Sequence, residues 1–160
     1  MIEAVIFDMD GLMFDTERMA NAVLEQTAEE FGVPGIRAFA RTLVGVNAAA
    51  GRRLYFERYG REFPYDEFIR RKTELMEARI EENGVPLKPG LMELLRFLKE
   101  QGYRTAVATS TSRQRAAGYL KRSGTAPYFD REVYGDMVEK SKPDPDIYLK
   151  AAAALGVDPA

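Results

Sequence analysis

The feature that most constrains the fold is a short apolar segment that ends in two carboxylates. Residues 3–8 read EAVIFD, and the apolar residues do not alternate with polar ones. The lack of alternation predicts a strand buried on both faces, which is typical of a parallel sheet covered by helices. Asp8 ends this strand, Asp10 follows, and Gly11 breaks the segment. The pattern therefore predicts a charged site at one edge of a sheet.

Further strands and helices alternate along the second half of the chain. A strand is predicted over 103–109, where an apolar run leads into the hydroxyl residues TSTS, and a weaker strand over 132–135. Helices are predicted over 90–101, 112–123 and 146–155. Strands that alternate with helices imply an α/β protein with a Rossmann-like, doubly wound parallel sheet.

The segment between the first two strands is too long for one crossover connection. Its apolar spacing predicts helices over 16–31, 47–59 and 66–83, and Pro86 and Pro89 mark the junction that follows. We therefore expect a small α-helical cap, residues 16–85, inserted after strand one. The α/β core would comprise residues 1–15 and 86–160.

Composition excludes several kinds of chemistry and partner. The chain has no Cys and no His, which removes disulfides, thiolate and imidazole metal sites and histidine-based catalysis. With 23 basic and 25 acidic residues the net charge is −2, which gives no electrostatic reason to expect nucleic acid. No apolar run approaches the ~20 residues that span a bilayer. We expect no membrane partner, no secretory signal and a cytoplasmic protein.

The polar residues at the strand ends predict a phosphate site. The carboxyl ends of parallel strands meet at one edge of a sheet, so Asp8, Asp10, Thr109, Ser110 and Lys142 can converge there. Two neighbouring carboxylates need a cation, and Mg²⁺ prefers hard oxygen ligands together with a substrate phosphate. Hydroxyl groups and a lysine bind phosphate oxygens. One carboxylate can attack phosphorus while the other transfers protons.

Three motifs, in order, resemble those of the haloacid dehalogenase superfamily: DMDGLMFDTE, ATST and KPDPDIY. The helical cap is similar to that of the β-phosphoglucomutase-like branch. The resemblance implies that Asp8 is the nucleophile and a Mg²⁺ ligand. Asp10 would be the general acid and base, and its backbone carbonyl the second protein ligand. Thr109 would bind the phosphoryl group and Lys142 would neutralise charge.

The implied activity is Mg²⁺-dependent hydrolysis of a small phosphorylated metabolite, such as a sugar phosphate, through an aspartyl-phosphate. The family also has a fourth, acidic motif after one more strand beside strand one, and this sequence stops at Ala160 before it. We therefore expect a C-terminally incomplete core, weak Mg²⁺ binding and low activity. We expect a monomer whose exposed sheet edge is open to pairing with another chain.

Three alternatives remain open. A sugar phosphomutase is one, but its cap arginine shortly follows a Gly-Val pair, whereas here Asn47 and Ala48 follow Gly45-Val46. A receiver-type signalling domain also uses Asp, Thr or Ser and Lys, but its Asp follows the third strand. The last is an inactive fragment retained for interaction.

Several charged residues have ordinary structural explanations. Asp144 and Asp146 are expected to cap the helix that follows them. The arginines and lysine at 52–53 and 70–72 are expected on solvated helix faces, or else one of them grips the distal group of the substrate.

Overall fold

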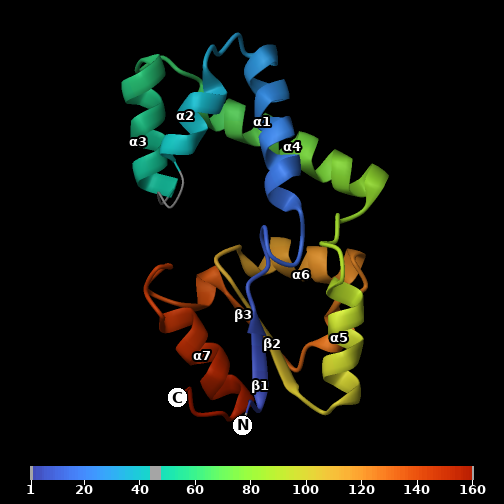
Figure 1. The fold of residues 1–160 in the computed structure, drawn as a ribbon. Coiled ribbons are helices and arrows are strands. Elements are labelled where there is room, and N and C mark those ends of the chain that lie inside the picture. Colours follow the sequence, from blue (N-terminus) through green and yellow to red (C-terminus); the bar gives the residue numbers. More distant parts are fainter. Residues whose placement is uncertain (1, 44–47, 160) are drawn as a thin grey trace. The chain divides into compact units, whose positions relative to one another are not determined.

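The computed structural model describes residues 2–43 and 48–159, which divide into two compact units. Unit 1 consists of Met1–Thr16 and Gly84–Ala160, and unit 2 is Glu17–Asn83. Unit 1 contains every strand of the described chain, whereas unit 2 is helical (Figure 1). No helix in the described ranges combines the length and the apolar character needed to cross a membrane.

Unit 1 is built on a parallel sheet. Its strands are β1 (Ala4–Phe7), β2 (Arg104–Thr109) and β3 (Arg131–Tyr134), in the order β1-β2-β3. Ala4 pairs with Arg104 at one end, and Thr109 pairs with Tyr134 at the other. This confirms the parallel arrangement expected from the sequence, with the third strand one residue earlier than predicted.

Helices cover the two faces of this sheet (Figure 1). They are α5 (Leu91–Glu100), α6 (Arg113–Arg122) and α7 (Asp146–Leu155). On the α7 face, Ala106 and Ala108 of β2 form a buried cluster with Ile147 and Ala151. Because strand residues two apart share a face, these small alanines let α7 lie close to the sheet. The doubly wound α/β fold is thus confirmed.

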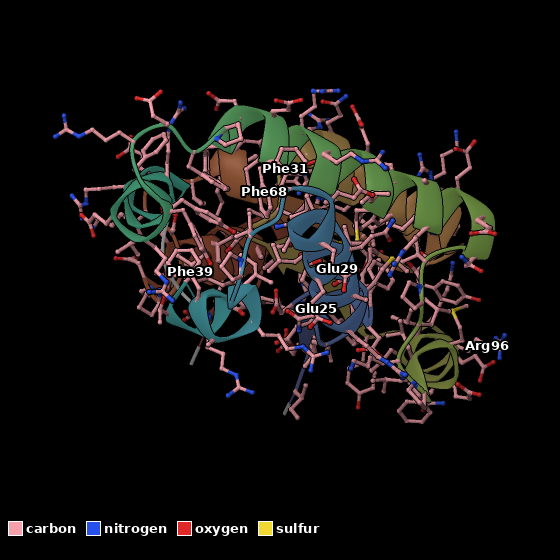
Figure 2. All side chains as sticks on the ribbon, turned by 90° about the horizontal axis from the view of Figure 1, so that it is seen from above. Glu25, Glu29, Phe31, Phe39, Phe68 and Arg96 are labelled. Carbon is pink, nitrogen blue, oxygen red and sulfur yellow. The ribbon has the colours of Figure 1, made fainter. Side chains whose placement is uncertain are left out.

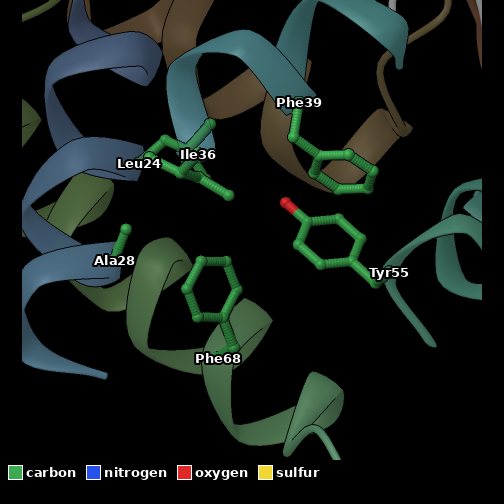
Figure 3. Close-up of a cluster of buried hydrophobic side chains, with 6 residues drawn as sticks. All are labelled: Leu24, Ala28, Ile36, Phe39, Tyr55 and Phe68. Carbon is green, nitrogen blue, oxygen red and sulfur yellow. The ribbon is translucent and has the colours of Figure 1, made fainter. Parts of the chain in front are cut away.

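Unit 2 contains most of α1 (Thr16–Glu30) together with α2 (Ile36–Thr42), α3 (Ala48–Tyr59) and α4 (Tyr65–Asn83). Its interior is a cluster made of Leu24, Ala28, Ile36, Phe39, Tyr55 and Phe68 (Figure 3). Phe68 is fully buried, and its ring centroid lies 5.4 Å from that of Phe31 and 5.7 Å from that of Tyr55. Figure 2 shows Phe31, Phe39 and Phe68 among the helices of this unit. Aromatic packing therefore holds unit 2 together.

Helix α2 is absent from the sequence-based prediction. It has only seven residues, it follows Gly35 in the left-handed region (φ 70°), and no side chain caps its start. Such a helix lacks both the length and the capping residue on which a prediction from sequence depends. The predicted start of the next helix at Asn47, and the segment Gly45-Val46, lie outside the described residues.

Candidate active site

The carboxyl edge of the sheet brings Asp8 and Lys142 into contact. Asp8 directly follows β1, and Lys142 lies in the loop between β3 and α7. The Lys142 Nζ donates to Asp8 Oδ1 over 2.7 Å and to the Ala108 carbonyl oxygen over 2.9 Å. The Asp8 side chain is 36% exposed and that of Lys142 is 24% exposed. A partly desolvated ion pair therefore joins residues that are 134 positions apart in the sequence.

The surroundings of Lys142 keep its ammonium group charged. Burial by itself lowers the pKa of Lys142, but the hydrogen bond to Asp8 and the neighbouring Tyr148 outweigh burial, so its pKa is raised. The Lys142 Nζ lies 4.8 Å from the centroid of the Tyr148 ring. The site thus contains a fixed positive charge beside one carboxylate.

The second carboxylate, Asp10, is surrounded by hydroxyl groups. Thr16 Oγ1 donates to Asp10 Oδ1 over 2.9 Å. Thr111 Oγ1 donates to Asp10 Oδ2 over 2.6 Å, and Thr109 Oγ1 lies 3.4 Å from the same oxygen. Hydrogen bonds to both oxygens fix the orientation of this carboxylate.

A tight turn places Asp10 at the edge of the sheet. Gly11 has φ 77°, a conformation that residues with a Cβ rarely adopt. The Gly11 N–H donates to the Phe14 carbonyl, and the Met13 N–H donates to the Met9 carbonyl. The chain therefore reverses immediately after Asp10 instead of continuing β1.

The loop after β2 carries Thr109 and Ser110. Thr109 is 1% exposed, and its hydroxyl oxygen accepts a hydrogen bond from the Thr111 N–H over 3.1 Å. Ser110 is exposed, and within the described ranges its hydroxyl makes no hydrogen bond to either carboxylate. The backbone of this loop packs against Gly135, whose N–H donates to the Thr111 carbonyl over 3.1 Å.

The structure therefore brings together Asp8, Asp10, Thr109 and Lys142, while Ser110 lies in the adjoining loop without a side-chain contact to them. Sequence reasoning missed the contacts of Thr16, Thr111 and Tyr148 with this group. Thr111 belongs to the hydroxyl run that was expected to supply phosphate ligands, and Thr16 is the first residue of a predicted helix. Their long-range contacts with Asp10 leave no signal in local spacing.

The other charged residues pair locally. The Asp144 carboxylate accepts the Asp146 N–H over 3.1 Å at the start of α7, which agrees with the predicted role of Asp144. The prediction that Asp146 also caps the helix is wrong, because Pro145 occupies the N-cap and Asp146 is the first helical residue. In unit 2, ion pairs join Arg52 to Asp66, Arg53 to Glu57, Arg70 to Glu74 and Arg71 to Glu30. These arginines thus have carboxylate partners within their own unit.

The oxygen atoms at this edge suit a hard cation. Asp8 and Asp10 supply two carboxylates, and no donor in the described part of the chain binds Oδ2 of Asp8. Within the same residues no group of three or more His, Cys, Asp or Glu side chains is arranged to hold a metal ion. Mg²⁺ commonly binds through one or two carboxylates plus water and substrate phosphate, so this donor set fits it.

Comparison with known proteins assigns the chain to a family. The sequence profile of the haloacid dehalogenase-like hydrolases matches residues 2–160. A phosphorylated carbohydrates phosphatase of Thermotoga maritima is 35% identical over 158 residues, which are 99% of this chain and 73% of the relative. A beta-phosphoglucomutase of Bacillus subtilis is 31% identical over 165 residues, with coverages of 99% and 72%.

A solved structure agrees with these relatives. It is a mutant CbbY from Rhodobacter sphaeroides in complex with xylulose 1,5-bisphosphate, with a TM-score of 0.75 and 32% identity. The match covers 98% of this chain and 74% of that one. Profile, sequence and fold agree over nearly the whole chain, and the chain belongs to the haloacid dehalogenase-like hydrolase family.

Proposed function

We propose that this chain is a Mg²⁺-dependent phosphatase that acts on small phosphorylated carbohydrates. The observation that carries the proposal is the Asp8–Lys142 pair, 2.7 Å long, beside a second carboxylate held by hydroxyl groups at the carboxyl edge of a parallel sheet. The substrate class follows the names of the relatives: one is a phosphatase of phosphorylated carbohydrates, and another binds a pentulose bisphosphate.

Asp8 is the nucleophile in this proposal. Lys142 binds Oδ1, which leaves Oδ2 to form a bond to phosphorus while the bond from phosphorus to the leaving oxygen breaks. Lys142 offsets the negative charge that would otherwise repel the phosphate. The product of this half-reaction is an aspartyl-phosphate together with the dephosphorylated carbohydrate.

Asp10 transfers the protons in this scheme. It donates a proton to the leaving oxygen in the first half-reaction and accepts one from water in the second. That water attacks phosphorus, which releases inorganic phosphate and restores the Asp8 carboxylate. Thr16 and Thr111 orient the Asp10 carboxylate, and Thr109 contributes a buried hydroxyl at the edge that would receive the phosphoryl group.

The carboxylate of Asp8 and the backbone carbonyl of Asp10 would hold Mg²⁺, which leaves the Asp10 carboxylate free to transfer protons. When bound, the ion supplies additional positive charge that stabilises the transferring phosphoryl group. We propose further that unit 2 is a cap that selects the substrate, and that the protein acts as a monomer. The cytoplasmic location stays a prediction.

The decisive test is phosphate release from a panel of sugar phosphates, with Mg²⁺ and with chelator. Wild-type turnover should require Mg²⁺, and Asp8→Asn should lower kcat roughly a thousandfold or more because it removes the nucleophile. Asp158→Asn is the matched control. Asp158 is exposed and follows α7, whose last carbonyls bind Arg104 at the opposite edge of the sheet.

Chelator-resistant turnover, or full activity in Asp8→Asn, would contradict the proposal. If Asp158→Asn loses as much activity as Asp8→Asn, the loss in Asp8→Asn is explained by a change in charge or folding and not by removal of the nucleophile.

A sugar phosphomutase is the second candidate, because the beta-phosphoglucomutase of Bacillus subtilis is also a relative. A mutase would require a bisphosphate activator and would release an isomeric sugar phosphate. The same panel separates the two functions when inorganic phosphate and sugar phosphates are quantified in parallel.

A further inference from the structure

We propose that Tyr148 is a positioning residue for Lys142, with its aromatic ring holding the ammonium group beside Asp8. Tyr148 lies in the first turn of α7, and Lys142 lies in the loop that leads into this helix. The inference rests on the proposed function, in which Lys142 offsets the charge of Asp8 and of the incoming phosphate.

Three contacts define the position of the ammonium group. The Lys142 Nζ lies 2.7 Å from Asp8 Oδ1, 2.9 Å from the Ala108 carbonyl oxygen and 4.8 Å from the Tyr148 ring centroid. A cation within about 6 Å of a ring centroid is attracted by the negative face of the ring, and the attraction grows with desolvation. Only 24% of the Lys142 side chain is exposed, so this contact is partly screened from water.

The ring contact differs from the Asp8 contact in one respect that matters for catalysis. Asp8 changes its chemical state during turnover, because its carboxylate becomes an acyl phosphate, which is a mixed anhydride. The ion pair with Lys142 therefore changes at each half-reaction. The Tyr148 ring and the Ala108 carbonyl remain the same throughout, so they can keep Lys142 in place while Asp8 carries the phosphoryl group.

Packing of the hydrophobic core does not explain why residue 148 is aromatic. Its neighbour Ile147 is 1% exposed and belongs to the buried cluster between α7 and the sheet, whereas Tyr148 is 37% exposed. The aromatic side chain therefore lies at the margin of the packed face, where both its ring and its hydroxyl interact with Lys142.

Two substitutions at Tyr148 distinguish the effect of the aromatic ring from the effect of side-chain size. Tyr148→Leu keeps an apolar side chain but removes the ring face, and it should lower kcat/KM about fivefold to thirtyfold. The inhibition constant of inorganic phosphate should rise by a similar factor, since a displaced lysine no longer attracts the anion. Tyr148→Phe retains the ring face but removes the hydroxyl, which also interacts with Lys142, so it should lose clearly less than Tyr148→Leu. Leu149→Ala, at a neighbouring residue that is 48% exposed, should match wild type.

A spectroscopic measurement tests the contact independently of activity. Protons near a ring face experience a ring-current shift, so the ε-methylene signal of Lys142, assigned by its loss in Lys142→Met, should lie upfield. The upfield shift should persist in Tyr148→Phe and vanish in Tyr148→Leu. Titration with inorganic phosphate, followed through the same signal, gives the phosphate affinity of each variant.

The outcomes are distinguishable. A wild-type chain without turnover on any sugar phosphate refutes the proposed function, and the ring-current shift and phosphate titration then decide the role of Tyr148 alone. An active wild type with Tyr148→Leu unchanged in both kcat/KM and phosphate affinity refutes the positioning role. Equal losses in Tyr148→Leu and Tyr148→Phe would also refute it, because they would not depend on the ring.

Discussion

Replacing Gly135 by alanine should disable the site without touching a proposed catalytic side chain. Gly135 directly follows β3, and a Cβ built on it would lie 2.1 Å from the Ser110 carbonyl oxygen and 2.7 Å from the Ser110 carbonyl carbon. Ordinary contact begins near 3.4 Å, so the backbone at Ser110 must retreat by about 1.3 Å. Gly135 does not have a positive φ, and the glycine is needed for close approach alone.

The displaced backbone carries Thr109 and Thr111, whose hydroxyl groups contact Asp10. A misplacement of about 1 Å in a catalytic constellation can lower the rate about a hundredfold. We expect kcat/KM of Gly135→Ala to fall by about that factor, with a loss of about 1–3 kcal/mol in the free energy of unfolding from overpacking.

The matched control is Gly118→Ala. Gly118 lies inside α6, and an added Cβ would meet nothing within 4 Å. Alanine there should preserve activity and stabilise the helix by up to about 1 kcal/mol. The assays are sugar phosphate turnover and urea unfolding of both variants. Wild-type turnover and stability in Gly135→Ala would refute the reasoning, because the loop would then have room for a methyl group.

Two further predictions concern unit 2. Phe68→Ala should lower the free energy of unfolding by about 3–5 kcal/mol, because Phe68 is fully buried among aromatic rings. Phe68→Leu should lower it much less. Equal decreases for the two variants in urea unfolding would contradict this prediction. Burial raises the pKa of Tyr55 to about 12, so the folded state holds its proton where the unfolded chain, with a pKa near 10, has lost it. As pH rises from about 10 to 12, the free energy of unfolding of the wild type should therefore fall by up to about 3 kcal/mol relative to that of Tyr55→Phe. If the free energies of unfolding of the two proteins change with pH in parallel, this contribution is excluded.

The sequence predicted the sheet because its strands carry a strong signal. The apolar run before Asp8 and the run before Thr109 lack polar alternation, and a parallel sheet covered on both faces buries such segments. Helix α7 was predicted with the bounds that the structure shows, since Asp146 begins it and Gly156 ends it. Helix α2 gave no comparable signal, because it is short and uncapped.

The candidate site was partly predictable for the same reason. Asp8 and Lys142 could be placed together because each follows a strand of one parallel sheet. The contacts of Thr111 with Asp10, 101 residues away, and of the Tyr148 ring with Lys142 depend on side-chain geometry. These contacts form only when the loops fold. The sequence around Thr111 and Tyr148 does not reveal them, because the same local patterns are found at ordinary helix starts.

The pairing of β1 with β2 has a consequence for biosynthesis. Ala4 pairs with Arg104, so β1 has to wait for about a hundred further residues before its partner is made. At about 5–20 residues per second, this delay is roughly 5–20 s. Unit 2 is continuous in sequence and is complete within that interval, so its helices can assemble on the ribosome first. The nascent β1, meanwhile, presents an unpaired apolar strand to chaperones and to other chains. The ion pair between Asp8 and Lys142 has to wait longer still, because the two residues are 134 positions apart.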